Sequence, residues 1–250
     1  MNTKNKKNSL PSLESIWADS GARELRFKGN GFRSFLAPYC HYSLSSHVFG
    51  DVSFNEKKLR ALESHLSNEK WKDRYLSIEG KVDQNFWKAH GYQILEYQVC
   101  HLWKPKILLP PNYDLRFEVH SFETKQGQEL YNQTAGKVFG VDSVFTKRWL
   151  KLNKLISHHI LLIVIKNSKN KPMAIAGLSC IKKNGFIHSV AVLPQFQGRG
   201  LLSHLMNFTQ KTGEGHGCTH FVCTSRNPKM LSMMDALTPF NHIFKRKDQA

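Results

Sequence analysis

Cysteine is scarce in this chain of 250 residues, and its five cysteines are scattered. They stand at Cys40, Cys100, Cys180, Cys218 and Cys223. No two of them form a Cys-x-x-Cys pair, which argues against a disulfide framework and against a zinc knuckle. The adjacent His158 and His159 meet no second cluster of possible ligands. We therefore expect no metal site and a reducing compartment, the cytoplasm.

Long apolar runs are also missing. The longest, Ile160–Ile165, is far short of the ~20 residues that a membrane-spanning helix needs, and it is typical of a buried strand. Residues 1–20 lack the apolar segment of a secretory signal. They carry Lys4, Lys6 and Lys7 among Asn and Ser instead. We expect a flexible basic tail over residues 1–20 and no membrane span.

Acidic side chains are few, with 19 Asp and Glu against 36 Lys and Arg, which gives a net charge of +17. A chain this basic attracts anions, whether a polyphosphate cofactor, nucleic acid, an acidic protein or a membrane surface. Only Lys70–Tyr75 interleaves basic and aromatic residues as a nucleic-acid binder does, and a solvated helix end explains that segment more simply. Nucleic-acid binding is therefore a minor alternative.

The second half has the clearer pattern of secondary structure. Period-2 alternation and short apolar runs predict strands over 115–122, 160–165, 173–180, 186–192 and 221–224. Helical spacing predicts helices from Glu123, over 144–155, from Leu201 to about Gly213 and over 228–237. Asn184-Gly185 predicts a hairpin turn within 182–185, because both residues tolerate positive φ. The order β-α-α-β-β-β-α-β-α is mixed α/β.

The first half repeats the later part of this order more faintly. We expect a hairpin over 23–36 about Gly29-Asn30-Gly31, a strand within 41–49, a helix over 56–66, a strand over 75–79, a helix over 83–90 closed by Gly91, and a long strand over 92–103. The repetition indicates an internal duplication that lacks its opening elements. Pro110-Pro111 marks the edge of a linker, so we place domains at 21–107 and 108–250. The alternative is an unrelated α+β cap over the first half.

The most informative segment is Val190–Leu202, where a strand runs into a glycine-containing turn that opens a helix. The first amides of a helix have no partner inside it, and the helix dipole adds partial positive charge there. Gly198 and Gly200 let the backbone approach a ligand, and Arg199 adds a cation. Such a turn suits a pyrophosphate. The segment lacks the Gly-Lys-Ser/Thr of nucleoside triphosphatases and the GxGxxG of dinucleotide-binding folds.

This segment resembles the signature of the GCN5-related N-acetyltransferases (GNAT), a strand ending near V-x-P followed by Q/R-x-x-G-x-G/A. Gln197, Gly200 and Val192-Leu193-Pro194 match, whereas Leu202 departs from the usual Gly or Ala. The resemblance covers about residues 114–240. It implies that acetyl-coenzyme A lies between the strands at 186–192 and 221–224. The residues that it implies for the cofactor are Val190, Ala191, Val192, Gln197, Gly198, Arg199, Gly200, Leu201, Leu202 and Asn227.

The same resemblance implies an N-acetyltransferase whose acceptor is a primary amine on a small molecule, a peptide or a protein lysine. Phe186 stands where many members have a glutamate, and His188, on the same strand face, is our candidate base. Met234 stands where many members have an acidic tyrosine. Water, Cys223 or Ser225 is then left to protonate the leaving thiolate. Two alternatives stay open, a structural His188 and a regulatory module that binds coenzyme A without turnover.

The first half has no equivalent phosphate-binding turn. Its counterpart would fall near 51–57, where no glycine follows Asp51 and where Asp51 and Glu56 repel a pyrophosphate. We therefore expect a non-catalytic copy that covers the second domain and shapes the acceptor pocket. The chain ends soon after Phe240, which leaves little room for the family's last strand. We expect the first half to supply that missing edge by pairing.

Overall fold

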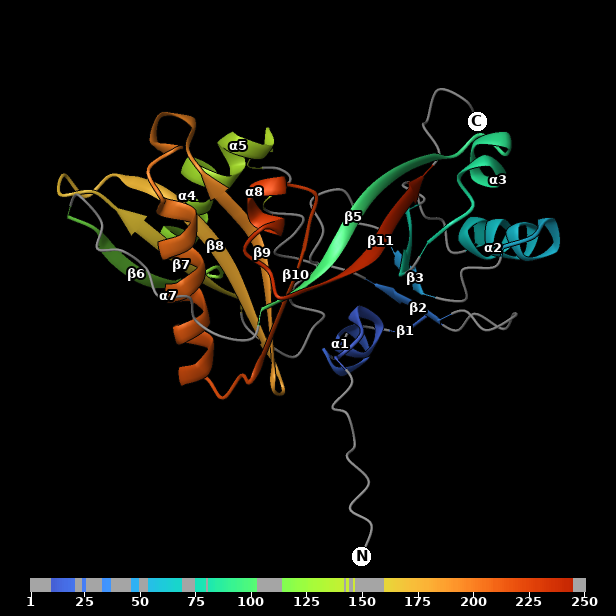
Figure 1. The fold of residues 1–250 in the computed structure, drawn as a ribbon, viewed down its shortest axis with the longest axis horizontal. Helices are drawn as coiled ribbons and strands as arrows, with labels where there is room; N and C mark the ends of the chain where they lie inside the picture. Colours follow the sequence, from blue (N-terminus) through green and yellow to red (C-terminus); the bar gives the residue numbers. More distant parts are fainter. Residues whose placement is uncertain are drawn as a thin grey trace, which may run out of the picture.

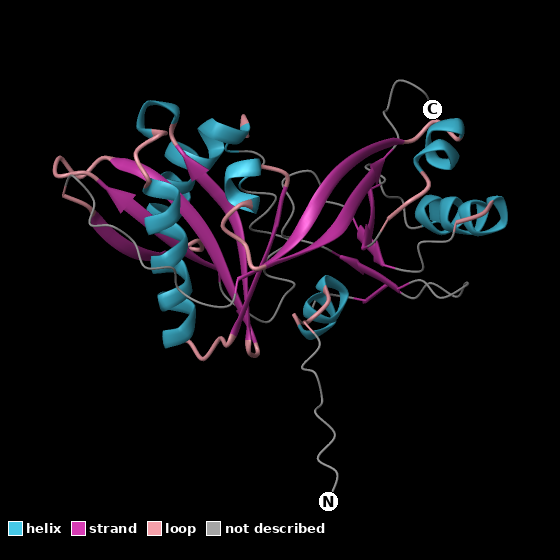
Figure 2. Cartoon of the chain, viewed as in Figure 1, coloured by secondary structure: helices cyan, strands magenta, loops and turns pink. Residues whose placement is uncertain are grey.

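The computed structural model describes residues 10–20, 24–25, 33–36, 46–49, 54–68, 75–79, 81–102, 114–141, 143, 146 and 160–244. Within them, strands from both halves form one eight-stranded mixed sheet in the order β4-β11-β5-β10-β9-β8-β7-β6, beside a three-stranded sheet β1-β2-β3 (Figure 1). Figure 2 shows helices on both sides of the large sheet. The prediction of a mixed α/β fold is confirmed.

The bounds of the elements follow the expected order closely. The first half contains α1 (Leu13–Asp19), β1 (Glu24–Leu25), β2 (Arg33–Leu36), β3 (Ser46–Phe49), α2 (Glu56–Asn68), β4 (Tyr75–Glu79), α3 (Gln84–Ala89) and β5 (Gln93–Leu102). The second half contains β6 (Arg116–Ser121), α4 (Lys125–Tyr131), the π-helical turn η1 (Asn132–Gly136), α5 (Lys137–Phe139), β7 (Ile160–Lys166), β8 (Pro172–Ile181), β9 (Asn184–Val192), the 3-10 turn η2 (Pro194–Phe196), α7 (Leu201–Gly215), β10 (His220–Ser225), α8 (Pro228–Leu231) and β11 (Ala236–Phe244).

Strand β7 is buried on both faces, which explains its uninterrupted apolar sequence. Leu162 and Val164 belong to a core with Tyr131 at the end of α4. The alternate residues Ile163 and Ile165 belong to a second core with α7. Helices α4 and α7 therefore cover opposite faces of the sheet, and the run over 160–165 is the buried strand that the sequence predicts.

The turn between β8 and β9 differs from the prediction. Ile181 pairs with Asn184, so the turn consists of Lys182 and Lys183, and Lys182 has a φ of 53°. Gly185 lies within β9, where a Cβ atom would stand 2.6 Å from the ring of Phe221. The hairpin is confirmed, but Gly185 is there for the close approach of an aromatic ring rather than for the turn.

The two halves exchange their last strands. Within each half a strand, a short helix and a second strand follow one another, as β4-α3-β5 and as β10-α8-β11. Strand β5 pairs antiparallel with β10 of the second half, and β11 pairs antiparallel with β4 of the first half. The two exchanged strands also pair with each other, with Tyr97 opposite Phe240. The expectation that the first half supplies the edge next to β10 is confirmed. The expectation of little room for a last strand is wrong, because β11 spans Ala236–Phe244.

The predicted helix over 228–237 is wrong beyond Leu231. Asn227 caps α8, its side chain accepts a hydrogen bond from the amide of Lys229, and the helix ends after one turn. The chain then enters β11 at Ala236. Thr238-Pro239 breaks any strand-like pattern at this point, because proline is unusual inside a sheet.

Helix α1 closes the junction between the two halves, so the expectation of a flexible tail over residues 1–20 is wrong for Leu13–Asp19. Leu13 and Ile16 are buried in the core that contains Tyr131 and Phe240. The amide of Leu13 donates a 2.6 Å hydrogen bond to the carboxylate of Glu79 at the end of β4. Burial raises the pKa of Glu79, although the amides of Leu13 and Glu14 counteract that effect. The Glu79 carboxylate thus accepts hydrogen bonds from the first amides of the helix and places a negative group at the helix N-terminus.

Several predictions lie outside the described residues. They concern most of the helix over 144–155, the turn Gly29-Asn30-Gly31, the linker edge at Pro110-Pro111, residues 1–9, residues 51–53 and residues 70–74. In the part of the chain that the structure describes, no helix is both long and apolar enough to cross a membrane. The same residues contain no group of three His, Cys, Asp or Glu side chains suited to a metal ion.

Candidate functional site

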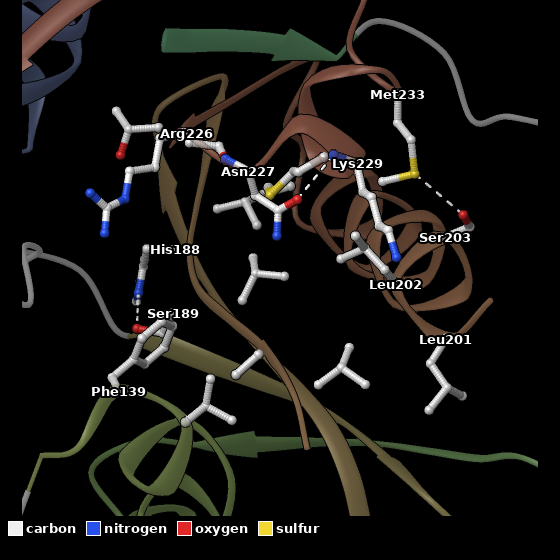
Figure 3. Close-up of a pocket in the computed structure, with 18 of the residues that line it drawn as sticks. Phe139, His188, Ser189, Leu201, Leu202, Ser203, Arg226, Asn227, Lys229 and Met233 are labelled. Carbon is white, nitrogen blue, oxygen red and sulfur yellow. Dashed lines mark hydrogen bonds between the residues drawn. The ribbon is translucent and has the colours of Figure 1, made fainter. Parts of the chain in front are cut away.

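Strands β9 and β10 separate halfway along their length. They pair in parallel from Asn184 opposite His220 to Ile187 opposite Cys223, and the pairing stops there. Strand β9 continues to Val192 against β8 on its other side. A cavity of about 760 Å³ lies at this opening (Figure 3). The inner edge of β9 beyond Ile187 therefore offers backbone donors and acceptors that β10 does not use.

A bulge sits where β9 turns away from β10. His188 lies opposite Gly177 and Ala191 lies opposite Ile175, so β9 has one extra residue between these pairs. Ser189 accommodates it with a φ of 53°, an uncommon value for a side-chain-bearing residue. The bulge shifts the alternation of the strand, and both Ser189 and Val190 line the cavity.

The glycine turn lies at the other end of the cavity. Gly198 and Gly200 have φ values of 78° and 73°, and a Cβ atom built on either would have nothing within 4 Å. These glycines are thus needed for their backbone conformation, and they leave open space before α7. Gly200 caps this helix of 15 residues, whose first amides have no intrahelical acceptor. The side-chain Nε2 of Gln197 donates a 3.1 Å hydrogen bond to the carbonyl of Val192 and connects the turn to β9.

Nine of the ten residues predicted for the cofactor line this cavity. They are Val190, Ala191, Val192, Gln197, Gly198, Gly200, Leu201, Leu202 and Asn227. Arg199 does not, and its guanidinium lies 5.7 Å from the centre of the Phe196 ring. Leu202 puts an isobutyl group into the cavity where the GNAT signature has Gly or Ala, which leaves less room at the turn.

His188 is buried at the cavity wall, with 7% of its surface exposed. Its Nδ1 lies 3.0 Å from the Ser189 hydroxyl and its Nε2 lies 3.3 Å from the Ser179 hydroxyl. A Cβ atom at Gly177 would stand 2.3 Å from the imidazole, so this glycine makes room for the ring. The Tyr131 hydroxyl hydrogen-bonds with Ser189, and burial raises its pKa. A chain of hydroxyls thus connects the buried Tyr131 to the imidazole.

Ser225 and Cys223 differ in their access to the cavity. Ser225 lines it, and its hydroxyl accepts a 3.1 Å hydrogen bond from the amide of Asn227. Cys223 points into the core next to α7 and stands opposite Cys100 on β5. The hydrogen bond with the Cys100 thiol, together with burial, raises the pKa of Cys223 well above its usual range. The prediction of Cys223 as a site residue is therefore corrected, because its thiol is buried between strands outside the cavity.

Several lining residues escaped the sequence analysis. They include Ser189 on the bulge, Arg226 and Lys229 beside Asn227, Phe139 on α5, Phe240 on β11, and Leu13 and Tyr97 from the first half. Arg226 could have been found, because it directly precedes Asn227, which the resemblance assigns to the cofactor. Leu13 and Tyr97 carry no such signal, because only the strand exchange brings the first half to this cavity.

Comparison with protein families places the family called "Acetyltransferase (GNAT) family" on residues 125–236. The comparison with curated proteins gives no match. Among solved structures, a conserved protein of unknown function from Staphylococcus epidermidis is similar at 13% identity, with a TM-score of 0.65, over 94% of this chain and 98% of that one. A GCN5-related N-acetyltransferase from Kribbella flavida is similar at 16% identity, with a TM-score of 0.59, over 93% and 92%.

A tandem GNAT protein from the clavulanic acid biosynthesis pathway is similar at 11% identity, with a TM-score of 0.54, over 85% of this chain and 77% of that one. Identities this low establish a shared fold rather than a shared activity. The splayed strands, the glycine turn at α7 and the family match agree on the second half, and the tandem neighbour agrees with the two lobes. Residues 125–236 are a domain of the acetyltransferase (GNAT) family, within a chain that has a two-lobed GNAT fold.

Proposed function

We propose that the protein transfers an acetyl group from acetyl-coenzyme A to a primary amine, by direct attack while both substrates are bound. The observation that carries this proposal is one continuous cavity. It is lined by the free edge of β9 at Val190 and Val192 and by the glycine turn at Gly198 and Gly200. The cavity offers strand-edge backbone for an extended arm and helix amides for a diphosphate, the two features that coenzyme A needs.

The glycine turn and α7 form the anion-binding part of the site. The turn leaves space for a charged group, since a Cβ atom built on Gly198 or Gly200 would have nothing within 4 Å. The amides at the start of α7 and the ammonium of Lys229 would hold the pyrophosphate. Gln197 positions the turn through the hydrogen bond from its side-chain Nε2 to the carbonyl of Val192.

The bulge in β9 is the place for the chemistry. Acetyl-coenzyme A supplies an activated acyl group and a thiolate that leaves. A backbone amide at Val190 would polarise the carbonyl oxygen of this acyl group. The amine nitrogen bonds to the acetyl carbon as the carbon–sulfur bond breaks. His188 takes the proton of the amine through the Ser189 hydroxyl, which lines the cavity and touches its Nδ1.

The leaving thiolate needs a proton, and Met234 cannot give one. Ser225 lines the cavity and is our candidate, as a relay between water and the sulfur. Water itself does the same work if Ser225 is out of reach. The four described free thiols Cys100, Cys180, Cys218 and Cys223 suit a cytoplasmic enzyme.

His188→Ala is the test of the base. Thiol release from acetyl-coenzyme A with a panel of amines should fall by about 10²- to 10⁴-fold at pH 7, because a general base contributes a factor of this size. The rise of rate with pH should also flatten. The shift in melting temperature caused by acetyl-coenzyme A should stay nearly intact. The control is His216→Ala, which changes an exposed histidine at the end of α7 that does not line the cavity.

Unchanged turnover in His188→Ala would remove His188 as the base and leave the rest of the proposal standing. Thermal stabilisation by acetyl-coenzyme A without thiol release for any amine would favour the regulatory module instead. Absence of stabilisation would remove the enzyme proposal altogether.

A further inference from the structure

Part of the cavity wall is apolar. Leu13, Tyr97, Phe186 and Phe240 belong to the core that contains Tyr131, and Val138 and Phe139 of α5 line the cavity as well. Leu13, Phe186 and Phe240 are buried, whereas Val138 and Phe139 are large apolar side chains with more than a third of their surface exposed. Exposed apolar groups at the rim of a cavity mark a surface that binds an apolar partner. We call these six residues the apolar compartment.

The described residues that line the cavity include basic side chains but no acidic ones. Arg226 and Lys229 are the basic ones apart from His188, and none is Asp or Glu. A polyamine or a lysine-rich peptide would bring several ammonium groups to a site whose described lining residues offer no carboxylate to receive them. An acceptor with a negative group of its own suits the site better.

The two cations lie on different sides of the cavity. Figure 3 shows Lys229 beside Leu202 and Ser203, next to the start of α7. Arg226 extends toward His188 on the side where Phe139 lies (Figure 3). Lys229 is thus placed for the cofactor's phosphates, and Arg226 is placed for the acceptor.

Arg226 is available for an anion. Its guanidinium lies 5.8 Å from the centre of the Tyr97 ring in the apolar compartment, and no described carboxylate pairs with it. The side chain is exposed, so it reaches a ligand without a large desolvation cost. A guanidinium resting on an aromatic ring keeps its planar fork free, and that fork binds a carboxylate through two parallel hydrogen bonds.

We propose that the acceptor is an α-amino acid with a large apolar side chain. Arg226 binds its α-carboxylate, and the apolar compartment takes the side chain. The amino group then points toward Ser189 and the β9 bulge. This inference rests on the proposed function and specifies its substrate. It also gives the first half a role, because Leu13 and Tyr97 supply part of the compartment.

The test compares matched acceptors on the full-length protein. Thiol release from acetyl-coenzyme A is measured with phenylalanine, phenylalanine amide, glycine and spermidine. We expect kcat/KM for phenylalanine to exceed that for its amide by about 10- to 100-fold, the range for a charge-assisted bidentate pair. Glycine, which lacks the side chain, and spermidine, which lacks the carboxylate, should both be poor acceptors.

Arg226→Gln should bring the ratio between phenylalanine and its amide close to one while the thermal shift with acetyl-coenzyme A persists. The matched control is Lys229→Gln, which removes a cation from the same cavity. It should weaken the response to acetyl-coenzyme A and keep the ratio. A ratio that Arg226→Gln leaves unchanged, or equal use of the amide or of spermidine by the native protein, would overturn the inference.

A binding measurement separates this inference from the proposed function. Calorimetry with N-acetylphenylalanine in the presence of coenzyme A needs no turnover. We expect binding to the native protein and a loss of at least about tenfold in Arg226→Gln. Binding without thiol release would sink the catalytic proposal and keep the acceptor class, whereas thiol release from other amines without this binding would do the reverse.

Discussion

Lys166 ends strand β7 with its ammonium group almost completely buried, and Glu118 on the neighbouring strand β6 supplies the opposite charge. The Lys166 Nζ lies 2.5 Å from the Glu118 Oε2, and His120 Nε2 lies 2.7 Å from the same oxygen. The hydrogen bond from Lys166 lowers the pKa of Glu118, and the bond from His120 lowers it further against the effect of burial. Removing this carboxylate would leave a buried cation unpaired.

Glu118→Gln should therefore lower the free energy of unfolding at pH 7 by about 2 kcal/mol, less than a fully buried pair would cost because Glu118 is partly exposed. The folded-state pKa of Glu118 lies below its unfolded value, so its contribution is complete above the unfolded pKa. The contribution disappears as the pH falls through the lowered folded pKa. Urea unfolding from pH 7 to pH 4 should show the two proteins beginning to converge below about pH 4.5.

The control is Glu56→Gln, which breaks the exposed pair with Arg60 on α2 and should change the free energy by less than about 1 kcal/mol. Equal effects of the two substitutions would refute the role of the buried ammonium.

Some site residues could be predicted from the local sequence, and others could not. The turn at Gly198 and Gly200 was predictable, because a strand, two glycines and a helix follow one another directly. Ser189 was not, because the extra residue of the bulge breaks the alternation that a sequence pattern assumes. Arg226 directly follows β10, and Tyr97 lies on β5 of the other half. Their contact therefore depends on the pairing of the two halves, which no local sequence pattern contains.

One of the contacts between helix α7 and the sheet is a close approach of glycine to an aromatic ring. Phe221 on β10 lies against two glycines, and a Cβ atom would stand 2.6 Å from its ring at Gly185 and 2.4 Å at Gly213. The second of these glycines is on α7, whose other end carries the amides that we propose to bind the diphosphate. The close approach of Gly213 to Phe221 therefore fixes the distance between α7 and the strands.

Gly213→Ala should lower the free energy of unfolding by about 1–2 kcal/mol, because overpacking against the ring outweighs the better helix propensity of alanine. Gly215→Ala is the matched control on the same helix, since a Cβ atom there meets nothing within 4 Å. It should be neutral or stabilising by about 0.5 kcal/mol. Denaturant unfolding of both variants measures the difference, and a stabilised Gly213→Ala would contradict the packing argument.

Elements with a strong local signal were predictable from the sequence, and those with a mixed signal were not. The helix over Gln84–Ala89 has Asp83 as its N-cap, and the amides of Asn85 and Phe86 bond to that side chain. Strand β11 carries Thr238-Pro239, and its β conformation comes from pairing with β5 and β4 on both sides. Tertiary pairing overrides local preference there, which is why a helix over 228–237 was the wrong expectation.

On the scale of the whole molecule, the exchange of β5 and β11 makes the two halves depend on each other. In a chain cut between residues 107 and 108, the second half alone would leave β10 with one strand neighbour and β11 with none among the described strands. We expect residues 108–250 alone to aggregate or to lack a cooperative unfolding transition, since unpaired strand edges are exposed. Co-expression with residues 1–107 should restore a soluble complex, as measured by size-exclusion chromatography and calorimetry. A second half that folds and unfolds cooperatively by itself would rule out this dependence.

The duplication itself was visible in the repeated order of strand, helix and strand. The exchange of the last strands was not, because the same order of elements is compatible with two separate sheets. Only the registers of β5 against β10 and of β11 against β4 decide between the two arrangements.

The strand exchange also limits how the gene can evolve. The first half has no glycine turn of its own and could lose its opening elements without harm to a phosphate site. The first half cannot lose β4 and β5, because β11 lies between these two strands and β10 pairs with β5. A change in the length or register of β4 or β5 would therefore disturb the pairing of β10 and β11, which belong to the half that carries the cavity.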